Sequence, residues 1–215
     1  MANSKPYVIL SAAMSMDGKI ATRKGESKFS SSKDLARVHR LRGSVDAILV
    51  GRNTVSVDNP SLTVRHAKGR NPLRIILDPK ATISPDSKIA KTSKKIHTMA
   101  IVSEIASSRR VSILEKKGLE VIKCGKIRID LKKLLSILAK QGIRKILVEG
   151  GGTTNWYFLK EKLVDEIIVT ITPYVVGGKE SVSLVEGRGF DKISYPLKLK
   201  QVTRMGSEII LCYIV

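Results

Sequence analysis

The chain has 215 residues, of which 42% are hydrophobic, so it is long enough to bury a core within one domain. Its 39 basic and 19 acidic residues give a net charge of +20, but the basic residues are spread from Lys5 to Arg204 and only 4% of residues are aromatic, which makes a nucleic-acid-binding module the weaker interpretation. No apolar stretch approaches the roughly 20 residues of a membrane-spanning helix, and no secretory signal is recognisable, so we expect a cytoplasmic protein.

Short apolar runs bounded by polar residues or glycine recur along the chain. Such runs are typical of strands that are buried on both faces. The predicted strands are Tyr7–Met14, Ala47–Gly51, Leu73–Asp78, Thr98–Ser103 and Lys145–Gly150.

Helical patterns lie between several of these runs. Ser32 can cap a helix over residues 33–43, and Asp130 can cap a second helix that Gly142 ends. The apolar residues that share one face of the first helix are Leu35, Val38 and Leu41. The order strand, helix, strand predicts an α/β fold with a mostly parallel sheet.

The C-terminal part has a different pattern. Segments 165–178, 197–206 and 207–215 have strand character without intervening helices, and Met205-Gly206-Ser207 is a plausible hairpin turn. No repeat or low-complexity linker divides the chain. We therefore expect one domain, residues 1–215, whose sheet is completed by antiparallel strands.

Three glycines follow the last predicted parallel strand, in the stretch ILVEGGGTTNW. At a strand end in front of a helix, bare backbone N–H groups favour an anion, so a pyrophosphate could lie against Gly150, Gly151 and Gly152 with Thr153 or Thr154 adding a hydroxyl. A tight turn that needs positive φ angles explains the glycines equally well. The G-x-G-x-x-G fingerprint of dinucleotide-binding folds is absent from this turn.

Two other polar loops also follow predicted strands. Residues 50–65 contain Thr54, Asp58, Asn59 and Arg65, while residues 14–21 contain Asp17, Gly18 and Lys19. Because the carboxyl ends of parallel strands meet at one edge of a sheet, the three loops should converge on one crevice, where open α/β sheets bind ligands.

Cysteine and histidine are sparse. Cys124 and Cys212 have no partner at metal-ligand spacing, and the histidines, His39, His66 and His97, are scattered. We expect no metal site and interpret both cysteines as small buried hydrophobic residues.

In combination, the motifs SMDGKIA, VGRNTVSVDNPSLTVR, PLRIILD, ILVEGGGTTNW and LVDEIIVTITP resemble the pyrimidine reductases of riboflavin biosynthesis. The resemblance runs over nearly the whole chain and keeps its order. It implies a dihydrofolate reductase-like fold and an enzyme that uses NADPH to reduce a ribosylamino-pyrimidine 5′-phosphate to its ribitylamino form. In this chemistry the cyclic ribosylamine opens to an imine, and hydride adds to the ribose C1′.

The resemblance also implies roles for single residues. The implied catalytic residues are Asp58, Lys19 and Glu149. The implied substrate-binding residues are Ser27, Arg42, Asn59, Leu62, Arg65 and Glu149, with Arg65 on the phosphate. The implied cofactor-binding residues are Ala13, Thr54, Asp58, Lys80, Gly150, Gly151, Gly152 and Thr153, with Lys80 near the adenosine 2′-phosphate.

The chain departs from many members of this family in one loop, where Phe29 replaces a tryptophan, and it lacks the zinc deaminase motifs of the bifunctional members. A stand-alone reductase implies reduction before deamination and therefore the substrate 2,5-diamino-6-ribosylamino-4(3H)-pyrimidinone 5′-phosphate, with the deaminated uracil analogue as the alternative. Dihydrofolate reductase activity and NADH as cofactor are further alternatives. The family forms homodimers, and the apolar segment 208–215 suits an interface, although a buried strand explains it equally well.

Overall fold

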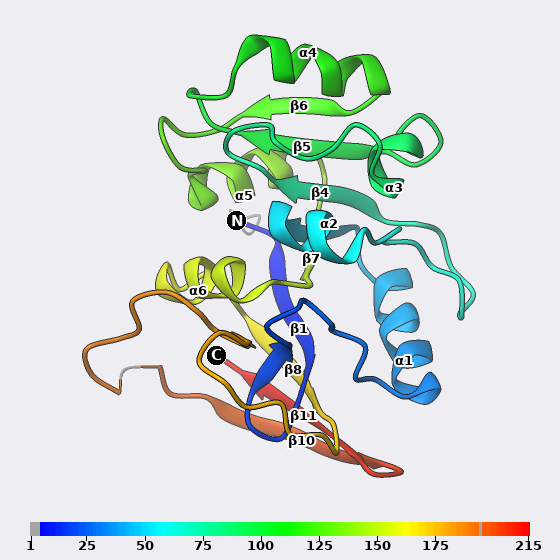
Figure 1. The fold of residues 1–215 in the computed structure, drawn as a ribbon, viewed down its shortest axis with the longest axis vertical. Coiled ribbons are helices and arrows are strands. Elements are labelled where there is room, and N and C mark those ends of the chain that lie inside the picture. The colour runs from blue at the N-terminus through cyan, green and yellow to red at the C-terminus, as the bar shows by residue number, and fades with distance from the viewer. Residues whose placement is uncertain (1–4, 194) are drawn as a thin grey trace.

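The computed structural model describes residues 5–193 and 195–215 as a nine-stranded sheet flanked by helices, with a two-stranded sheet beside it (Figure 1). The strands are β1 (Tyr7–Met14), β2 (Lys19–Ala21), β3 (Ala47–Gly51), β4 (Leu73–Leu77), β5 (Thr98–Val102), β6 (Glu120–Lys123), β7 (Lys145–Val148), β8 (Glu166–Ile171), β9 (Val182–Ser183), β10 (Lys198–Met205) and β11 (Glu208–Ile214). The helices are α1 (Ser32–Gly43), α2 (Arg52–Asp58), α3 (Lys88–Lys91), α4 (Ser108–Lys117), α5 (Leu131–Lys140) and α6 (Gly152–Lys160). In the described part of the chain, no helix has both the length and the apolar character needed to cross a membrane.

The strand order of the large sheet is β10-β11-β8-β1-β7-β3-β4-β5-β6. The strands from β8 to β6 in this order run parallel, and β11 pairs antiparallel with both β8 and β10. This confirms the predicted sheet, mostly parallel and completed by antiparallel C-terminal strands. Because β7 is inserted between β1 and β3, the segment that follows β7 begins at the middle of the sheet.

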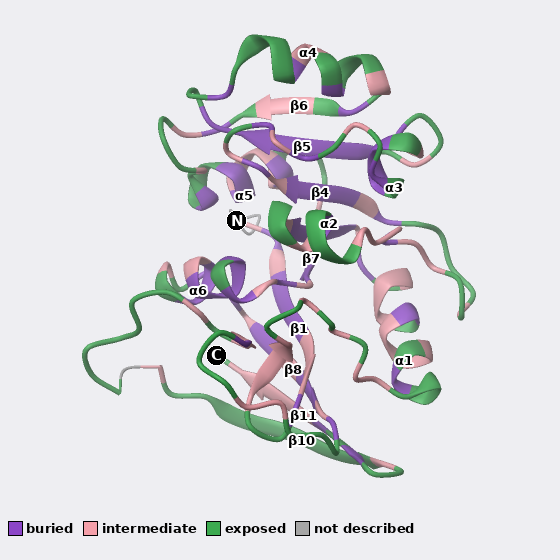
Figure 2. Cartoon of the chain, viewed as in Figure 1, coloured by how far each residue is buried: buried purple, intermediate pink, exposed green. Residues whose placement is uncertain are grey.

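Apolar side chains cover both faces of the parallel strands, which appear mostly buried in Figure 2. On one face, Leu49 of β3 shares a cluster with Phe158 of α6. On the other face, Ile48 shares a cluster with Val55 of α2 and Leu114 of α4. Burial on both faces explains why these strands are continuous apolar runs in the sequence rather than alternating ones.

Helix α1 begins with a different cap from the predicted one. The side chain of Ser31, not Ser32, accepts a hydrogen bond from the backbone N of Asp34 at 3.2 Å. The backbone N of Ser31 in turn donates to a carboxylate oxygen of Glu208 at 2.7 Å. This contact with a residue of the C-terminal hairpin favours one of several adjacent serines, any of which can cap a helix locally.

The buried face of α1 also differs from the prediction. Its buried residues are Asp34 and His39, whereas Leu35 is 46% exposed. Asp34 is satisfied by hydrogen bonds from its neighbours, including one from Thr170 Oγ1 at 2.9 Å. Leu35 and Val38 line a cavity instead of a core. Leu35 and Val38 therefore belong to a candidate binding site, whereas Leu41 packs against the core as predicted.

Helix α5 follows the prediction. The side chain of Asp130 accepts a hydrogen bond from the backbone N of Lys133 at 2.9 Å. Gly142 lies just beyond the end of the helix with a φ of 87°, a conformation that glycine adopts without steric cost. Both ends of this helix are therefore set by local residues that a sequence reveals.

The predicted C-terminal hairpin is also confirmed. Strands β10 and β11 pair antiparallel with Met205 opposite Glu208, and Gly206 in the turn has a φ of 65°. Strand β11 pairs on its other side with β8, so β10 is the edge of the sheet. Figure 2 shows β10 exposed along nearly its whole length.

The interpretation of the two cysteines is confirmed for Cys124, which is fully buried, and is wrong for Cys212. Cys212 is half-buried and its Sγ donates to Glu166 Oε1 at 2.9 Å. The same carboxylate accepts from Lys200 Nζ at 3.0 Å and from Tyr7 OH at 3.2 Å. Burial and the hydrogen bond to Glu166 raise the pKa of Cys212 to about 11. Cys212 is therefore part of a polar network at the sheet.

Candidate active site

The carboxyl ends of the parallel strands border a cavity of about 1310 Å³. Ala13 of β1, Gly51 of β3, Leu77 of β4 and Glu149 after β7 line it. Parallel strands end at the same edge of a sheet, and that edge is where ligands bind in folds of this class. The predicted convergence of loops therefore produces a single large cavity.

The glycine turn after β7 lies against the start of α2. Gly150 has a φ of 92°, and the peptide bond between Gly150 and Gly151 is cis. The backbone N of Gly151 donates to Thr54 Oγ1 at 3.0 Å. A Cβ at Gly152 would lie 2.5 Å from the carbonyl oxygen of Ser183, so the third glycine is required by close packing within the protein. The expected positive φ is therefore found at Gly150, while Gly151 and Gly152 line the cavity.

Glu149 forms an ion pair with Arg42. The guanidinium of Arg42 donates through Nε and Nη2 to the two carboxylate oxygens of Glu149, each at 2.7 Å. Both side chains are largely buried, with exposures of 12% for Glu149 and 14% for Arg42. Burial lowers the pKa of Arg42, but the charge and hydrogen bonds of Glu149 outweigh it and raise that pKa. Two residues predicted to contact substrate are therefore bound to each other.

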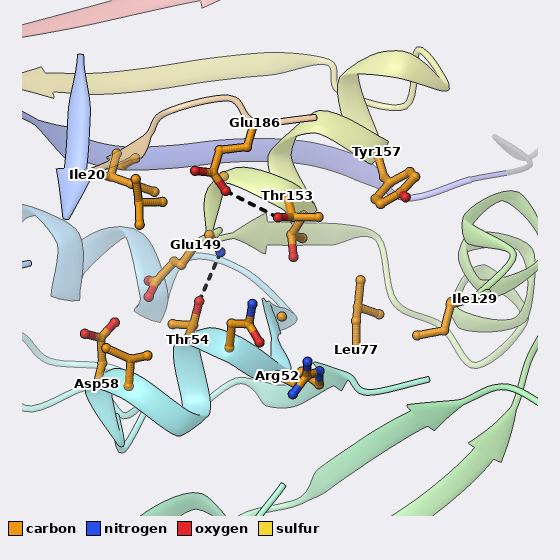
Figure 3. A pocket seen from close by; sticks show the side chains of 18 of the residues that line it. Ile20, Arg52, Thr54, Asp58, Leu77, Ile129, Glu149, Thr153, Tyr157 and Glu186 are labelled. Atoms are coloured by element: carbon orange, nitrogen blue, oxygen red, sulfur yellow. Dashed lines mark hydrogen bonds between the residues drawn. The ribbon is translucent and has the colours of Figure 1, made fainter. Parts of the chain in front are cut away.

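Asp58 ends α2 and is exposed to the cavity. Its Oδ1 accepts a hydrogen bond from Ser27 Oγ at 2.9 Å. Figure 3 shows Asp58 and Glu149 projecting into the same part of the pocket, with Thr54 beside them. This part of the pocket contains the two predicted catalytic carboxylates.

The other predicted catalytic residue, Lys19, lies on β2. Its Nζ donates to Ser183 Oγ at 3.0 Å and to the carbonyl oxygen of Ser181 at 3.3 Å. Lys19 is not among the residues that line the cavity, although its neighbours Ile20 and Ala21 are. The structure places the lysine at the margin of the site, tied to the strand that pairs with β2.

Four more predicted residues lie outside the cavity lining, and one of them is Gly150, the first residue of the glycine turn. Asn59, with a φ of 42°, caps the end of α2, and its Oδ1 accepts from the backbone N of Lys88 at 2.7 Å. Arg65 is exposed, and its Nη1 is 3.4 Å from Thr63 Oγ1. Lys80 is exposed beyond the end of β4. Leu62, by contrast, is both buried and part of the lining.

The sequence analysis did not predict one end of the cavity, here called the basic end. Arg52 at the start of α2 and Lys126 and Arg128 after β6 line this end, together with Tyr157 of α6. The cavity lining near Arg128 also includes the acidic side chains of Asp130 and Glu161. The guanidinium carbon of Arg128 lies 5.9 Å from the centre of the Tyr157 ring. Figure 3 shows Arg52, Leu77 and Tyr157 at this end, on the side of the pocket away from Asp58. The signal was the run GKIRID, which follows a strand that the sequence did not reveal.

Glu186 is a second residue that the sequence reading missed. Its side chain lines the cavity, and Thr153 Oγ1 donates to its Oε2 at 3.4 Å, as drawn in Figure 3. The backbone N of Glu186 donates to the carbonyl oxygen of Gly152 at 3.1 Å. A carboxylate therefore lies beside the first turn of α6, where the helix dipole favours negative charge.

Comparison with known proteins identifies the family of the chain that forms this cavity. The model of the RibD C-terminal domain matches residues 6–211. The chain belongs to the RibD C-terminal domain family. Family membership confirms the resemblance drawn from the motifs. Because the match covers almost the whole chain, it includes every loop that lines the cavity.

Relatives in the RibD C-terminal domain family are reductases. The chain is 43% identical to the 2,5-diamino-6-ribosylamino-4(3H)-pyrimidinone 5′-phosphate reductase of Methanothermobacter thermautotrophicus, over 98% of this chain and 99% of that protein. A protein of the same name from Aquifex aeolicus is 40% identical over 91% of this chain and 89% of its own length. The RibD structure from Acinetobacter baumannii aligns with a TM-score of 0.85 and 28% identity over 100% of this chain, which spans 59% of that longer chain. The expected fold is confirmed.

Proposed function

We propose that residues 1–215 form one stand-alone reductase domain that reduces 2,5-diamino-6-ribosylamino-4(3H)-pyrimidinone 5′-phosphate to its ribitylamino product in riboflavin biosynthesis, with NADPH as the reductant. The observation that carries this proposal is the 43% identity with a reductase of that name over essentially the full length of both proteins. The continuous nine-stranded sheet supports a single domain. The cavity supports a site for two ligands, because it extends from Asp58 and Glu149 at one end to Arg52 and Tyr157 at the other.

The basic end and the glycine turn fit NADPH. The turn leaves the first residues of α6 free of large side chains, which suits a pyrophosphate. Arg52, Lys126 and Arg128 supply cations for the adenosine 2′-phosphate, and they line the cavity, whereas Lys80 does not. We therefore assign recognition of this phosphate to these three residues instead of Lys80. NADPH, when bound, supplies the hydride that reduces the ribose C1′ of the ring-opened imine.

The two carboxylates at the opposite end of the cavity, Glu149 and Asp58, are assigned different roles toward the substrate. Both oxygens of Glu149 are engaged by Arg42, so the carboxylate is fixed in position and is suited to orient polar groups of the substrate. Asp58 is held by Ser27 through Oδ1, and no partner of Oδ2 is found among the described residues. Asp58 Oδ2 is therefore placed to move a proton during opening of the ribosylamine ring. Lys19 stays at the margin of the site, where its Nζ donates to Ser183 Oγ.

We keep the assignment of Arg65 to the substrate phosphate that the resemblance implies, although Arg65, like Lys80, lies outside the cavity lining. Its side chain is exposed, and its one side-chain hydrogen bond in the described structure is the long contact with Thr63 Oγ1. A guanidinium without a carboxylate partner can donate two parallel hydrogen bonds to a phosphate. Arg42, whose charge is compensated by Glu149, then supports Glu149 rather than the phosphate.

The deaminated uracil analogue is the second candidate substrate. RibD proteins are also relatives, at 35% identity for the protein from Actinobacillus pleuropneumoniae, and a RibD structure from Thermotoga maritima is described as a deaminase and 5-amino-6-(5-phosphoribosylamino)uracil reductase. The test is NADPH oxidation by the purified protein, followed by absorbance, with each compound separately. Turnover of the diamino compound alone supports the proposal, and turnover of the uracil compound alone replaces it.

The uncovered C-terminal hairpin supports a homodimer. Leu199, Val202 and Ile209 are 51%, 56% and 43% exposed on β10 and β11. Apolar side chains gathered on an uncovered sheet edge favour association with a second copy. Sedimentation equilibrium should find a dimer that Val202→Glu dissociates, and a monomer at every concentration would exclude this assembly.

A further inference from the structure

Two side chains of α1 hold the segment that ends in Arg65. Arg42 Nη1 donates to the carbonyl oxygen of Thr63 at 3.3 Å. One helical turn earlier, His39 Nδ1 accepts a hydrogen bond from the backbone N of Arg65 at 2.9 Å. The segment is therefore fixed to the helix through a carbonyl group on one side of Val64 and an amide group on the other.

The environment of His39 keeps its ring in the form that this contact needs. The side chain is 3% exposed, and its ring lies edge-on to His66 with centroids 4.7 Å apart. Burial and the charges of Arg42 and Arg65, with a smaller effect of His66, lower the pKa of His39 to about 4, against a smaller opposing effect of Glu149. Near neutral pH the imidazole is uncharged, so Nδ1 can accept and the ring proton is on Nε2.

The segment that His39 holds contains Arg65, which differs from Arg42 in having no carboxylate partner among the described residues. Arg42 is paired with Glu149, whereas no ion pair of Arg65 is found in the described part of the chain. An exposed arginine has many rotamers, and fixing its backbone reduces the conformational freedom that binding an anion must remove. His39 thus acts on the position of Arg65 without needing to touch a ligand.

We propose that His39 is a positioning residue for the substrate phosphate, because it fixes the backbone of Arg65 so that the guanidinium is presented to the anion. This inference rests on the proposed function, in which Arg65 binds the phosphate. It assigns to α1 a direct part in substrate affinity in addition to holding Glu149.

The test compares His39→Ala, which removes the acceptor, with His39→Asn, whose Oδ1 can take the place of Nδ1. In steady-state kinetics, His39→Ala should raise KM for the phosphorylated substrate about fivefold to tenfold, as expected for one lost hydrogen bond, with kcat and KM for NADPH unchanged. The inhibition constant of inorganic phosphate should rise in parallel. His39→Asn should restore most of the affinity, which a role in general stability does not predict. Thermal unfolding of each variant shows that it is folded, and His39→Asn remains informative where His39→Ala is unstable.

A double variant separates this inference from the proposed function. When His39 acts through Arg65, His39→Ala combined with Arg65→Ala should raise KM no further than Arg65→Ala alone. Additive effects, or an equal change of KM for NADPH, would overturn the positioning role. An unchanged KM in Arg65→Ala itself would remove the phosphate role of Arg65 and the inference with it, whereas a raised KM in Arg65→Ala beside an unchanged one in His39→Ala would overturn the inference only.

Discussion

Glu149 and Arg42 are separated by 107 positions in the chain, yet both carboxylate oxygens of Glu149 accept hydrogen bonds from the Arg42 guanidinium at 2.7 Å. The pair joins α1 to the segment after β7, and so connects the substrate end of the cavity to the middle of the sheet. Because both side chains are largely buried, removal of either one leaves the other charge with little access to water and without its ion-pair partner.

Arg42→Ala should therefore lower both stability and activity. Leaving Glu149 unpaired at low exposure should cost about 2–4 kcal/mol in the free energy of unfolding, measured by urea denaturation. Arg42→Lys keeps the charge but cannot donate from two nitrogens in a fixed plane, so it should recover stability better than kcat. The control is the double variant Arg42→Ala with Glu149→Gln, which should be more stable than Arg42→Ala alone because no unpaired charge remains. A double variant of lower stability would argue against this account.

Asp58 and Arg65 should affect different kinetic parameters. Asp58→Asn removes a group placed to move a proton and should lower kcat by about 10²–10⁴-fold. Arg65→Ala removes hydrogen bonds to a charged group and should raise KM for the phosphorylated substrate by about 10–100-fold, with kcat nearly unchanged. Steady-state kinetics at saturating NADPH separates these effects. Equal losses in both parameters for both variants would refute the division of roles.

The proposed use of NADPH should depend on the basic end of the cavity. Lys126→Ala and Arg128→Ala should each raise KM for NADPH about tenfold and leave KM for NADH unchanged, since only NADPH carries the 2′-phosphate. Lys80→Ala is the matched control, because Lys80 is an exposed lysine outside the cavity lining. A larger increase of KM for NADPH in Lys80→Ala than in the other two variants would show that Lys80 binds the 2′-phosphate, as first predicted from the sequence.

Glu186 should weaken the binding of the anionic cofactor. Its carboxylate lies within hydrogen-bonding distance of Thr153, beside the helix start at which a pyrophosphate is proposed to bind. Glu186→Gln retains the shape and removes the charge, so it should lower the Kd of NADPH about fivefold at low salt and less at high salt. Titration calorimetry measures this effect, with Glu180→Gln as a control that makes the same charge change at an exposed position. Weaker binding by Glu186→Gln would show instead that the carboxylate contacts the ligand favourably.

His39 should make stability depend on pH. Its folded-state pKa of about 4 lies below the usual 6.5, chiefly because the ring is buried and next because Arg42 and Arg65 are close. The unfolded chain therefore binds the proton more readily, so the stabilising effect of the neutral ring is present above pH 6.5 and is lost as pH falls toward 4. The free energy of unfolding, measured by urea denaturation at several pH values between 4 and 6.5, should change less steeply with pH in His39→Asn than in the parent protein. An equal pH dependence in the two proteins would count against the assignment.

The parallel strands were predictable because burial on both faces makes each of them a continuous apolar run. Strand β6 escaped detection for the opposite reason. It lies at the sheet edge with Glu120 and Lys123 exposed, so its short sequence EVIK contains no such run. The loop that follows it, with Lys126 and Arg128, then had no predicted strand end from which to be placed at the cavity.

Tertiary contacts account for the other differences. The motifs predicted that Asp58, Glu149 and the glycine turn lie at the same edge of the sheet. No local pattern in the sequence indicates that Arg42 pairs with Glu149. Nor does a sequence indicate that the side chain of Asn59 faces Lys88. Arg74 is the extreme case, because it is fully buried in β4 and its guanidinium donates to carbonyl and hydroxyl oxygens such as Ser61 O at 3.1 Å. Such hydrogen-bond partners are distant in the sequence and are brought together only by the tertiary fold, so a local pattern cannot predict them.

The insertion of β7 between β1 and β3 has a consequence for synthesis on the ribosome. Strand β1 emerges first, but the strands that pair with it, β7 and β8, begin only at Lys145 and Glu166. The strands from β3 to β6 can pair in order as they appear, whereas β1 must wait for most of the chain. The glycine turn and Glu149 arrive with β7, so the cavity cannot be complete before the strand that pairs with β1 has been synthesised.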